Sequence, residues 1–220
     1  MNTTPLARLG WRAAAGLLAS LALTATAMAQ APAKGSAAHI TAAVSKVNAA
    51  FMKSNAQQTP DWPSYGLDYA ETRHSKLNQI STSNVKELGL VWSYNLESKR
   101  GVESTPLVVD GIMYVTASWS VVHAVDVRTG QRIWSYDPKV PREAGYKGCC
   151  DVVNRGVALH EGKVFVASYD GRLIALDAAT GKVAWEKDTI IDRKFSYTIT
   201  GAPRVFKGNV IIGNGGGEYG

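Results

Sequence analysis

The sequence predicts an all-β protein of the β-propeller type, because one segment repeats, short strand patterns accompany it, and a tryptophan recurs within it. The segments AVDVRTGQRIW (124–134) and ALDAATGKVAW (175–185) share Ala, Asp, Thr, Gly and Trp at identical spacing, 51 residues apart. A period of about 40 to 50 residues with several strands per unit is typical of a β-propeller or another stacked β array. One four-stranded blade cannot bury both of its faces, so blades stack around an axis.

The first residues have the pattern of a secretory signal peptide. Arg8 and Arg12 precede an alanine-rich apolar stretch, 13–28, and Ala27-Met28-Ala29 offers a small-x-small cleavage site. An uncleaved membrane anchor is the alternative. The apolar run is, however, shorter than the roughly 20 residues that a membrane span needs, and threonines interrupt it. We therefore expect residues 1–29 to be a cleaved signal peptide and the protein not to be an integral membrane protein.

The net charge of the chain excludes few classes of function. The formal net charge is +6, and removal of the signal peptide would take away two arginines and no acidic residue. Lysines and arginines form no run, so nucleic-acid binding is not predicted. A mild positive balance could help an anionic cofactor or an acidic redox partner to approach, but solvated surface charge explains it more simply.

The mature chain divides into a lead-in and a strand-rich part. Residues 30–60 are rich in Ala, Ser, Lys and Gln, and weak helical periodicity from His39 to Phe51 predicts a short helix followed by a linker. From Asp61, runs of Trp, Tyr, Val and Ile are separated by Gly and Asp. This pattern predicts many short antiparallel strands through 61–220.

A strand pair lies upstream of each repeat. VDGIMYVTASWSVVHAVD and HEGKVFVASYDGRLIALD match in this way, with Gly111 equivalent to Gly162. A third copy begins at FKGNVIIGNGGGEYG, where Gly208 follows Gly162 by 46 residues. About three blades are therefore expected in this chain.

The Asp-x-x-Thr-Gly segment predicts a tight turn in which Asp and Thr bond backbone groups and Gly supplies a positive φ. The following strand delivers Trp134 in one repeat and Trp185 in the next. Recurrence at a fixed period favours tryptophans that dock between blades over tryptophans that bind a ligand. Trp92 is followed by Ser-Tyr, as Trp134 is, and indicates the end of an earlier, divergent unit.

Four features together resemble the pyrroloquinoline-quinone (PQQ) dependent alcohol dehydrogenases: the AxDxxTGxxxW units, KGCCDVVNRG, the opening DWPSYGLDYAETRHSKLNQI and TITGAP. The resemblance runs from about Asp61 to the last residue. The repeat alone says little about enzymology, because non-enzymatic scaffolds share it, whereas CC, NRG and GGGE in this order are specific. The resemblance implies an eight-bladed propeller in the periplasm. It further implies oxidation of alcohols to aldehydes with PQQ as bound redox cofactor, calcium as Lewis acid and a cytochrome c-type electron acceptor.

The adjacent cysteines are the most unusual of these features. The Cα atoms of Cys149 and Cys150 must lie about 3.8 Å apart across a trans peptide, below the usual range for disulfides. The resemblance implies a disulfide between them, whose strained ring lies against one face of the quinone. Two free cysteines in a loop are the alternative, although an oxidising compartment favours the bond.

Three polar residues are implied to bind the cofactor. PQQ carries carboxylates and quinone oxygens, and the planar guanidinium of Arg155 can bond such oxygens in fixed geometry. Glu103 in ESTP and Thr200 in TITGAP match a glutamate and a threonine that bond PQQ in the family. Without this context, each of the three would be read as a solvated or cross-strand surface residue.

The segment GNGGGE, 213–218, predicts a close approach of backbone to ligand, because successive glycines offer no packing in a strand pattern. The resemblance implies that Gly215, Gly216 and Gly217 contact PQQ and that Glu218 ligates calcium, which takes six to eight oxygen ligands. A lanthanide in place of calcium is left open. The simpler alternative is a glycine-rich hairpin with an exposed glutamate.

Some parts of the implied enzyme are not found in this sequence. The family's catalytic aspartate, its asparagine metal ligand and the tryptophan that covers PQQ lie beyond Gly220, so no catalytic residue is assigned. Asp151, Asp170 and Asp177 match no catalytic position. No CxxCH motif occurs, so these residues bind no c-type haem, and a haem domain elsewhere is left open.

Two other functions fit the sequence less well. One is a non-enzymatic periplasmic propeller of the outer-membrane assembly type, which has similar repeats but no evident need for CC, NRG and GGGE. The other is a PQQ enzyme of another substrate class, such as a membrane-anchored aldose dehydrogenase. We also expect that three blades or fewer would leave an apolar face exposed and would not fold stably alone.

Overall fold

The computed structural model describes Met1 and residues 31–216. The chain divides into a unit of residues 1–30 and a unit of residues 31–220. The described helices and strands all belong to the second unit. Residues 2–29 of the predicted signal peptide lie outside the described residues, and so do Gly217 and Glu218.

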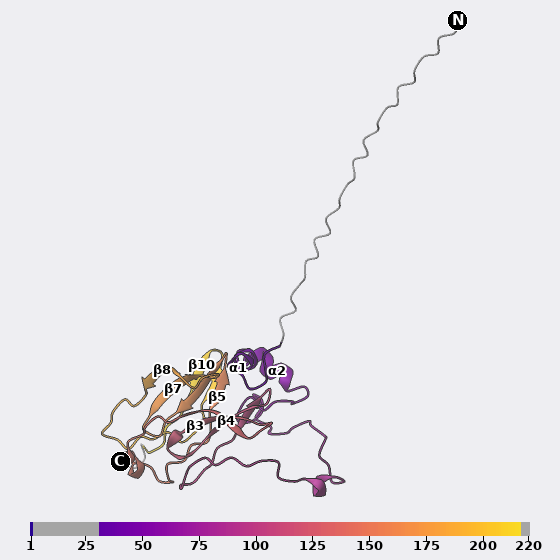
Figure 1. Ribbon diagram of the computed structural model, residues 1–220. Helices are drawn as coiled ribbons and strands as arrows, with labels where there is room; N and C mark the ends of the chain where they lie inside the picture. Colours follow the sequence, from indigo (N-terminus) through magenta and orange to yellow (C-terminus); the bar gives the residue numbers. More distant parts are fainter. Residues whose placement is uncertain (2–30, 217–220) are drawn as a thin grey trace. The chain divides into compact units, whose positions relative to one another are not determined.

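Among the described residues, the β structure consists of two four-stranded antiparallel sheets and one hairpin. Figure 1 shows the strands as arrows. The strands of the first sheet, in spatial and chain order, are β1 (Leu107–Val109), β2 (Ile112–Thr116), β3 (Val122–Asp126) and β4 (Gln131–Tyr136). Those of the second sheet are β5 (Ala158–His160), β6 (Lys163–Ala167), β7 (Arg172–Asp177) and β8 (Val183–Asp188). The hairpin is β9 (Arg204–Phe206) with β10 (Asn209–Ile211), and β9 contacts β5. The sheets match the repeats predicted from the sequence.

The first turn of each unit has the same backbone. Asp110-Gly111, Glu161-Gly162 and Lys207-Gly208 have φ values of 45° and 77°, 43° and 79°, and 48° and 75°. Two successive positive φ angles define the tight hairpin turns that match strand twist, and glycine adopts them without strain. The equivalence of the three glycines, predicted from spacing, is therefore present in the backbone.

The Asp-x-x-Thr-Gly turns also behave as predicted. Asp177 Oδ1 accepts the backbone N–H of Ala179 (3.1 Å) and of Thr180 (2.9 Å), and Gly181 has φ 70°. A Cβ on Gly181 would lie 2.7 Å from two ring atoms of Trp134. Only glycine allows the indole of the first sheet to pack against this turn of the second.

The indole contact recurs along the chain. Trp134 Nε1 donates to Ala178 O (3.0 Å), and Trp92 Nε1 donates to Val127 O (2.7 Å) one unit earlier. Gly130 covers Trp92 as Gly181 covers Trp134. Trp185, in β8, is 39% exposed, whereas Trp134 is 8% exposed. Within residues 31–216 no third turn covers Trp185.

The region before the sheets contains two helices, where the sequence predicted one. These are α1 (Ala37–Val44) and α2 (Ala49–Asn55). The N-cap side chain of Ser36 accepts the His39 N–H, and that of Asn48 accepts the Phe51 N–H. The second cap divides the predicted helix in two, because Asn favours a helix start over a helix interior. Ile40 and Val44 are fully buried in the main core with the strands, so this segment is more than a lead-in.

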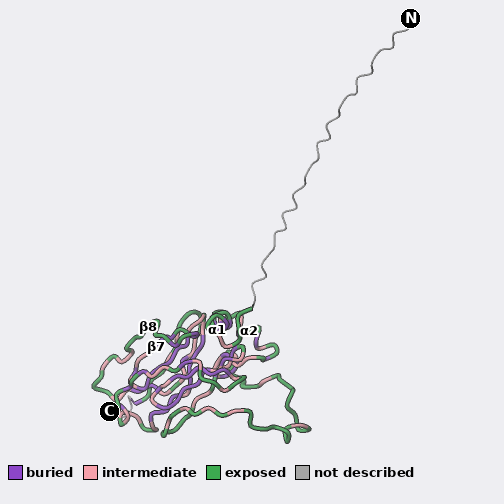
Figure 2. Tube along the Cα trace, viewed as in Figure 1, coloured by how far each residue is buried: buried purple, intermediate pink, exposed green. Residues whose placement is uncertain are grey.

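The prediction of strands from Asp61 onward was wrong for residues 63–106. Within this stretch the structure has a single 3₁₀ turn, Val85–Glu87, and no strand. The stretch is magenta in Figure 1 and mostly exposed in Figure 2. Leu90 and Val91 are 87% and 86% exposed. Strand-forming residues here have no neighbouring strand to pair with among the described residues, and a single strand is not stable in water.

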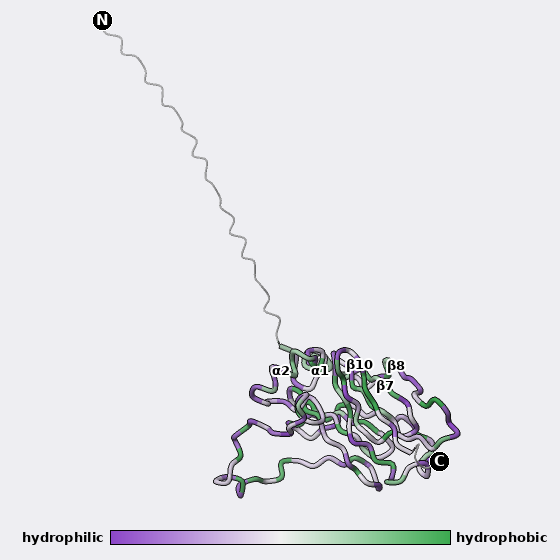
Figure 3. The backbone as a smooth tube through the Cα atoms, turned by 180° about the vertical axis from the view of Figure 1, so that it is seen from behind, coloured by the Kyte–Doolittle hydropathy of each residue, from purple (hydrophilic) through white to green (hydrophobic). Residues whose placement is uncertain are grey.

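The core follows the strands. Buried residues run along the inner strands of both sheets (Figure 2), and hydrophobic residues concentrate along the same strands when seen from behind (Figure 3). The outer strand β8 is exposed at every position. No helix in the described part of the chain is long and apolar enough to cross a membrane.

Candidate functional site

Arg155 is the centre of a polar cluster that joins three predicted site residues. Its Nη1 donates to Thr200 Oγ1 (2.6 Å), and its Nη2 lies 2.8 Å from Glu103 Oε2. The backbone N–H of Arg155 donates to Thr200 O (2.9 Å), and its carbonyl accepts the Thr105 N–H (3.1 Å). Each residue precedes a different first strand, β1, β5 or β9, so the corresponding segments of successive units meet.

A disulfide bond joins Cys149 and Cys150, whose Cα atoms are 3.8 Å apart. Both cysteines are exposed. They follow the 3₁₀ helix Arg142–Tyr146 in the connection between β4 and β5. The exposed ring precedes Arg155 by five residues in the same connection.

The glycine segment lies beside this connection. Gly215 pairs with Thr198 through two backbone hydrogen bonds of 2.9 Å. Gly216 is buried with φ 93°, and a Cβ there would overlap the Ser196 carbonyl oxygen and lie 3.5 Å from Lys147 O. Residues 196–200 therefore contact the glycine segment at one end and Arg155 at the other.

Glu218 is the metal ligand that the sequence predicts. Glu218 and Gly217 lie outside the described residues. Among the residues that are described, no group of three or more His, Cys, Asp and Glu side chains could hold a metal ion.

Asp151, which matches no catalytic position in the sequence, is a neighbour of the candidate site. Its Oδ1 contacts Arg100 Nη2, and its Oδ2 accepts the Gly101 N–H (3.2 Å). The hydrogen bond from Arg100, assisted by backbone N–H groups, lowers the pKa of Asp151 to about 2. Asp151 is therefore charged at neutral pH, and it directly follows the disulfide in the chain. The only signal for it in the sequence is its position after Cys150; nothing in the sequence pointed to Arg100.

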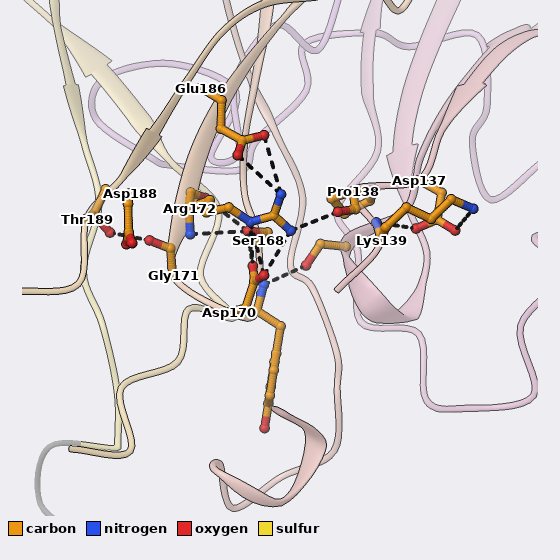
Figure 4. A network of polar contacts seen from close by, with 12 residues as sticks. Asp137, Pro138, Lys139, Ser168, Asp170, Gly171, Arg172, Glu186, Asp188 and Thr189 are labelled. Carbon is orange, nitrogen blue, oxygen red and sulfur yellow. Dashed lines mark hydrogen bonds and ion pairs between the residues drawn. The ribbon is translucent and has the colours of Figure 1, made fainter. Parts of the chain in front are cut away.

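The connection that carries the disulfide is held on two sides. Arg142 stacks on the Trp119 ring at 4.2 Å. On the other side, Arg172 Nη2 donates to Pro138 O (2.8 Å), while its Nε bonds Asp170 and its Nη1 reaches Glu186 (Figure 4). Arg172 thereby links β7 and β8 to the start of the connection. Planar guanidinium groups suit such multiple contacts.

The described residues fit an anionic, planar ligand. The Arg155 side chain is 38% exposed, and its partner Glu103 is 47% exposed. A guanidinium has five N–H donors, and two terminal nitrogens of Arg155 use one each on Thr200 and Glu103. Donors therefore remain for carboxylate or quinone oxygens, and the exposed disulfide offers a polarisable surface. The four-stranded sheets and their docking tryptophans are features of a β-propeller domain, and this cluster is its candidate ligand site.

Comparison with known proteins gives the family. The profile of the PQQ glucose/ethanol/alcohol dehydrogenase β-propeller domain matches residues 62–218. The chain therefore belongs to this family, which confirms the resemblance read from its motifs.

Individual relatives are similar over most of the chain. The quinohemoprotein alcohol dehydrogenase of Comamonas testosteroni is 65% identical over 204 residues, which is 93% of this chain and 28% of that protein. The 1-butanol dehydrogenase (cytochrome c) of Thauera butanivorans is 69% identical over 160 residues, 73% of this chain and 23% of that protein. The chain thus spans about a quarter of the length of these curated relatives.

Two solved structures of dehydrogenases are similar to this chain. The crystal structure of the Comamonas testosteroni enzyme matches with a TM-score of 0.82 at 69% identity, covering 84% of this chain and 28% of that one. A europium-containing methanol dehydrogenase matches with a TM-score of 0.69 at 41% identity, covering 76% and 30%.

Proposed function

We propose that the full-length gene product is a PQQ-dependent alcohol dehydrogenase that oxidises alcohols to aldehydes. The observation that carries the proposal is the combination, in a chain of this family, of an exposed vicinal disulfide with the cluster of Glu103, Arg155 and Thr200. Relatives named for alcohol oxidation are 65% and 69% identical to the chain.

Each residue of the cluster has a proposed task. Arg155 binds an oxygen of PQQ, and Thr200 holds one edge of the guanidinium. Glu103 cannot favour a polycarboxylate by charge, so we assign it to fixing the guanidinium plane through its 2.8 Å contact, with a hydrogen bond to PQQ where the cofactor presents a donor. The Cys149–Cys150 ring packs against one face of the quinone. The backbone of Gly215, Gly216 and Gly217 approaches its edge.

A metal ion completes the proposed site. Glu218 is proposed as its ligand in this chain, with further ligands supplied elsewhere in the protein. Calcium is the proposed ion because carboxylate and carbonyl oxygens suit it. The europium named for one structural relative keeps a lanthanide in consideration.

The bound quinone and its metal would supply hydride acceptance and Lewis-acid activation. The residues of this chain bind, orient and enclose that group; a catalytic base is not assigned among them. Small alcohols are the proposed substrates and a cytochrome c-type protein the proposed electron acceptor, in line with the name of the butanol-oxidising relative.

We propose export to the periplasm, with residues 1–29 as signal peptide, 30–60 as an N-terminal segment and 61–220 as part of an eight-bladed propeller. Trp92 supports a closed ring. It docks on Val127 and Gly130 as the fourth-strand residue Trp134 docks on the next sheet. Residues 90–94 would then be the fourth strand of a blade whose other strands come from elsewhere in the full-length protein.

Binding of PQQ to the purified apoprotein tests the proposal. Replacing Arg155 with lysine removes the planar fork, so we expect PQQ affinity to fall by about tenfold to a hundredfold, as charge-assisted hydrogen bonds are lost. Arg132→Lys is the control, because Arg132 is an exposed residue of β4 that pairs with Glu97 at 3.3 Å. Isothermal titration calorimetry measures both. Equal affinities for wild type and Arg155→Lys would contradict the assignment.

A further inference from the structure

Asn154 is a buried residue in the connection between β4 and β5 that carries the disulfide. The proposed function assigns it no role. It is 1% exposed. Its Nδ2 donates to Ser120 Oγ (3.2 Å) and to Ala167 O (2.9 Å), and its Oδ1 accepts the Gly156 N–H (3.0 Å). The last bond spans Arg155 and closes a side-chain turn of the kind that Asn favours. The amide of Asn154 thus fixes the backbone on both sides of Arg155.

Ser120 brings the first sheet into this arrangement. It lies in the turn between β2 and β3 and is fully buried. Its Oγ also accepts the Tyr169 N–H (3.0 Å), so one hydroxyl joins the turn of the first sheet to two segments of the second unit. Buried networks of this kind are costly to break, because each remaining partner loses its hydrogen bond.

The turn that presents Ser120 is strained. Trp119 and Ser120 have φ values of 62° and 61°, a conformation that residues other than glycine rarely adopt. Strain of this type persists where surrounding contacts enforce it, and it concentrates at functional sites. Here the Trp119 N–H donates to Val152 O (2.8 Å). The strained turn is therefore held by the segment that connects the disulfide to Arg155.

We propose that the Asn154–Ser120 pair positions Arg155 for the cofactor, an inference that rests on the proposed function. Asn154 acts through the backbone of residues 154–156 and does not itself touch the ligand. It sets the direction from which the guanidinium reaches Glu103 and Thr200. Ser120 in turn keeps Asn154 in place.

Ser120→Ala and Ser168→Ala form a matched pair that separates positioning from general stability. Both hydroxyls are fully buried in equivalent regions of neighbouring units. Ser168 Oγ donates to Asp170 Oδ1 and accepts the Arg172 N–H, and it makes no hydrogen bond to residues 152–156 in the described part of the chain. Asn154→Asp is a stronger change, because its carboxylate cannot donate to Ser120 or Ala167.

The experiment uses the full-length apoprotein, with hydrogen exchange of the peptide covering 152–157 and PQQ affinity by calorimetry. Ser120→Ala should speed exchange in this peptide and weaken PQQ binding by about fivefold, the value of one net hydrogen bond. Asn154→Asp should have the larger effect on both. Ser168→Ala should leave both unchanged even where it lowers the melting temperature.

The outcomes separate the two proposals. A wild-type protein that binds no PQQ would overturn the proposed function and this inference with it. A wild-type protein that binds PQQ, with affinity and exchange unchanged in Ser120→Ala, would overturn the positioning role alone. Equal losses of affinity in Ser120→Ala and Ser168→Ala would overturn it too, because general destabilisation would then explain both.

Discussion

The Arg155 side chain contacts two predicted site residues that are distant from it in sequence. Glu103 and Thr200 lie 52 and 45 residues away, yet both contact its guanidinium. The contacts follow from the repeat, because each residue stands just before the first strand of its unit. A planar cation with several N–H donors can bond groups from more than one of these segments at the same time.

At the same scale, Asp151 should contribute stability that depends on pH. Its pKa is lowered to about 2 from an ordinary value of 3.8, chiefly by the hydrogen bond from Arg100. A lowered folded-state pKa means that the contribution is fully present above the unfolded value and is lost as pH falls through the folded one. The stability difference between wild type and Asp151→Asn should therefore be constant from neutral pH to about 4 and should shrink toward pH 2.

Denaturant titrations of the full-length protein at a series of pH values measure this difference. Asp192→Asn serves as control, since Asp192 bonds the Lys194 N–H but forms no ion pair among the described residues. We expect the difference to be small, because exposed ion pairs contribute little. A difference that grew on acidification would contradict the assigned direction.

The candidate site could be predicted from the sequence only where a motif marked it. Cys149, Cys150 and Arg155 stand in one short motif, and Glu103 and Thr200 were implied by the family resemblance. Arg100 and Ser120 had no such signal, because an arginine and a serine are common surface residues. Their roles arise from turns that bring distant segments together, and one of these turns adopts a strained backbone that no local propensity indicates.

At the scale of the element, the contact between the repeated turn and a tryptophan is the main interaction that packs neighbouring units together. The turn places glycine under the indole, and the indole N–H bonds a carbonyl of the same turn. The sequence predicted this well, because the spacing of Asp, Thr, Gly and Trp is itself the structural requirement. It predicted residues 63–106 poorly, because strand propensity there is not matched by a partner strand in the described chain.

Substitution of Trp134 tests this contact between turn and tryptophan. Trp134→Phe should lower the free energy of unfolding by about 1 kcal/mol through loss of the bond to Ala178 O, and Trp134→Ala by about 3 to 5 kcal/mol through loss of the buried ring. Chemical denaturation of the full-length protein measures both. If Trp134→Ala cost no more than Trp134→Phe, the ring would not be a packing residue.

At the scale of the whole molecule, the account requires a further blade beyond β8. Trp185 is 39% exposed among the described residues, and all of β8 is exposed. If a following blade covers it, Trp185→Ala in the full-length protein should destabilise by about as much as Trp134→Ala, roughly 3 to 5 kcal/mol. A cost below about 1 kcal/mol, typical of surface substitutions, would contradict a continuous ring of docked blades.

Reconstitution of activity tests whether the protein is a PQQ-dependent alcohol dehydrogenase. The purified full-length apoprotein is assayed for dye-linked oxidation of a primary alcohol, with and without added PQQ and calcium, beside a Glu218→Ala variant. We predict turnover that requires both additions in the wild-type protein and is lost in the variant. A folded wild-type protein that neither binds PQQ nor oxidises any of a panel of alcohols would contradict the account and favour a propeller that binds protein partners.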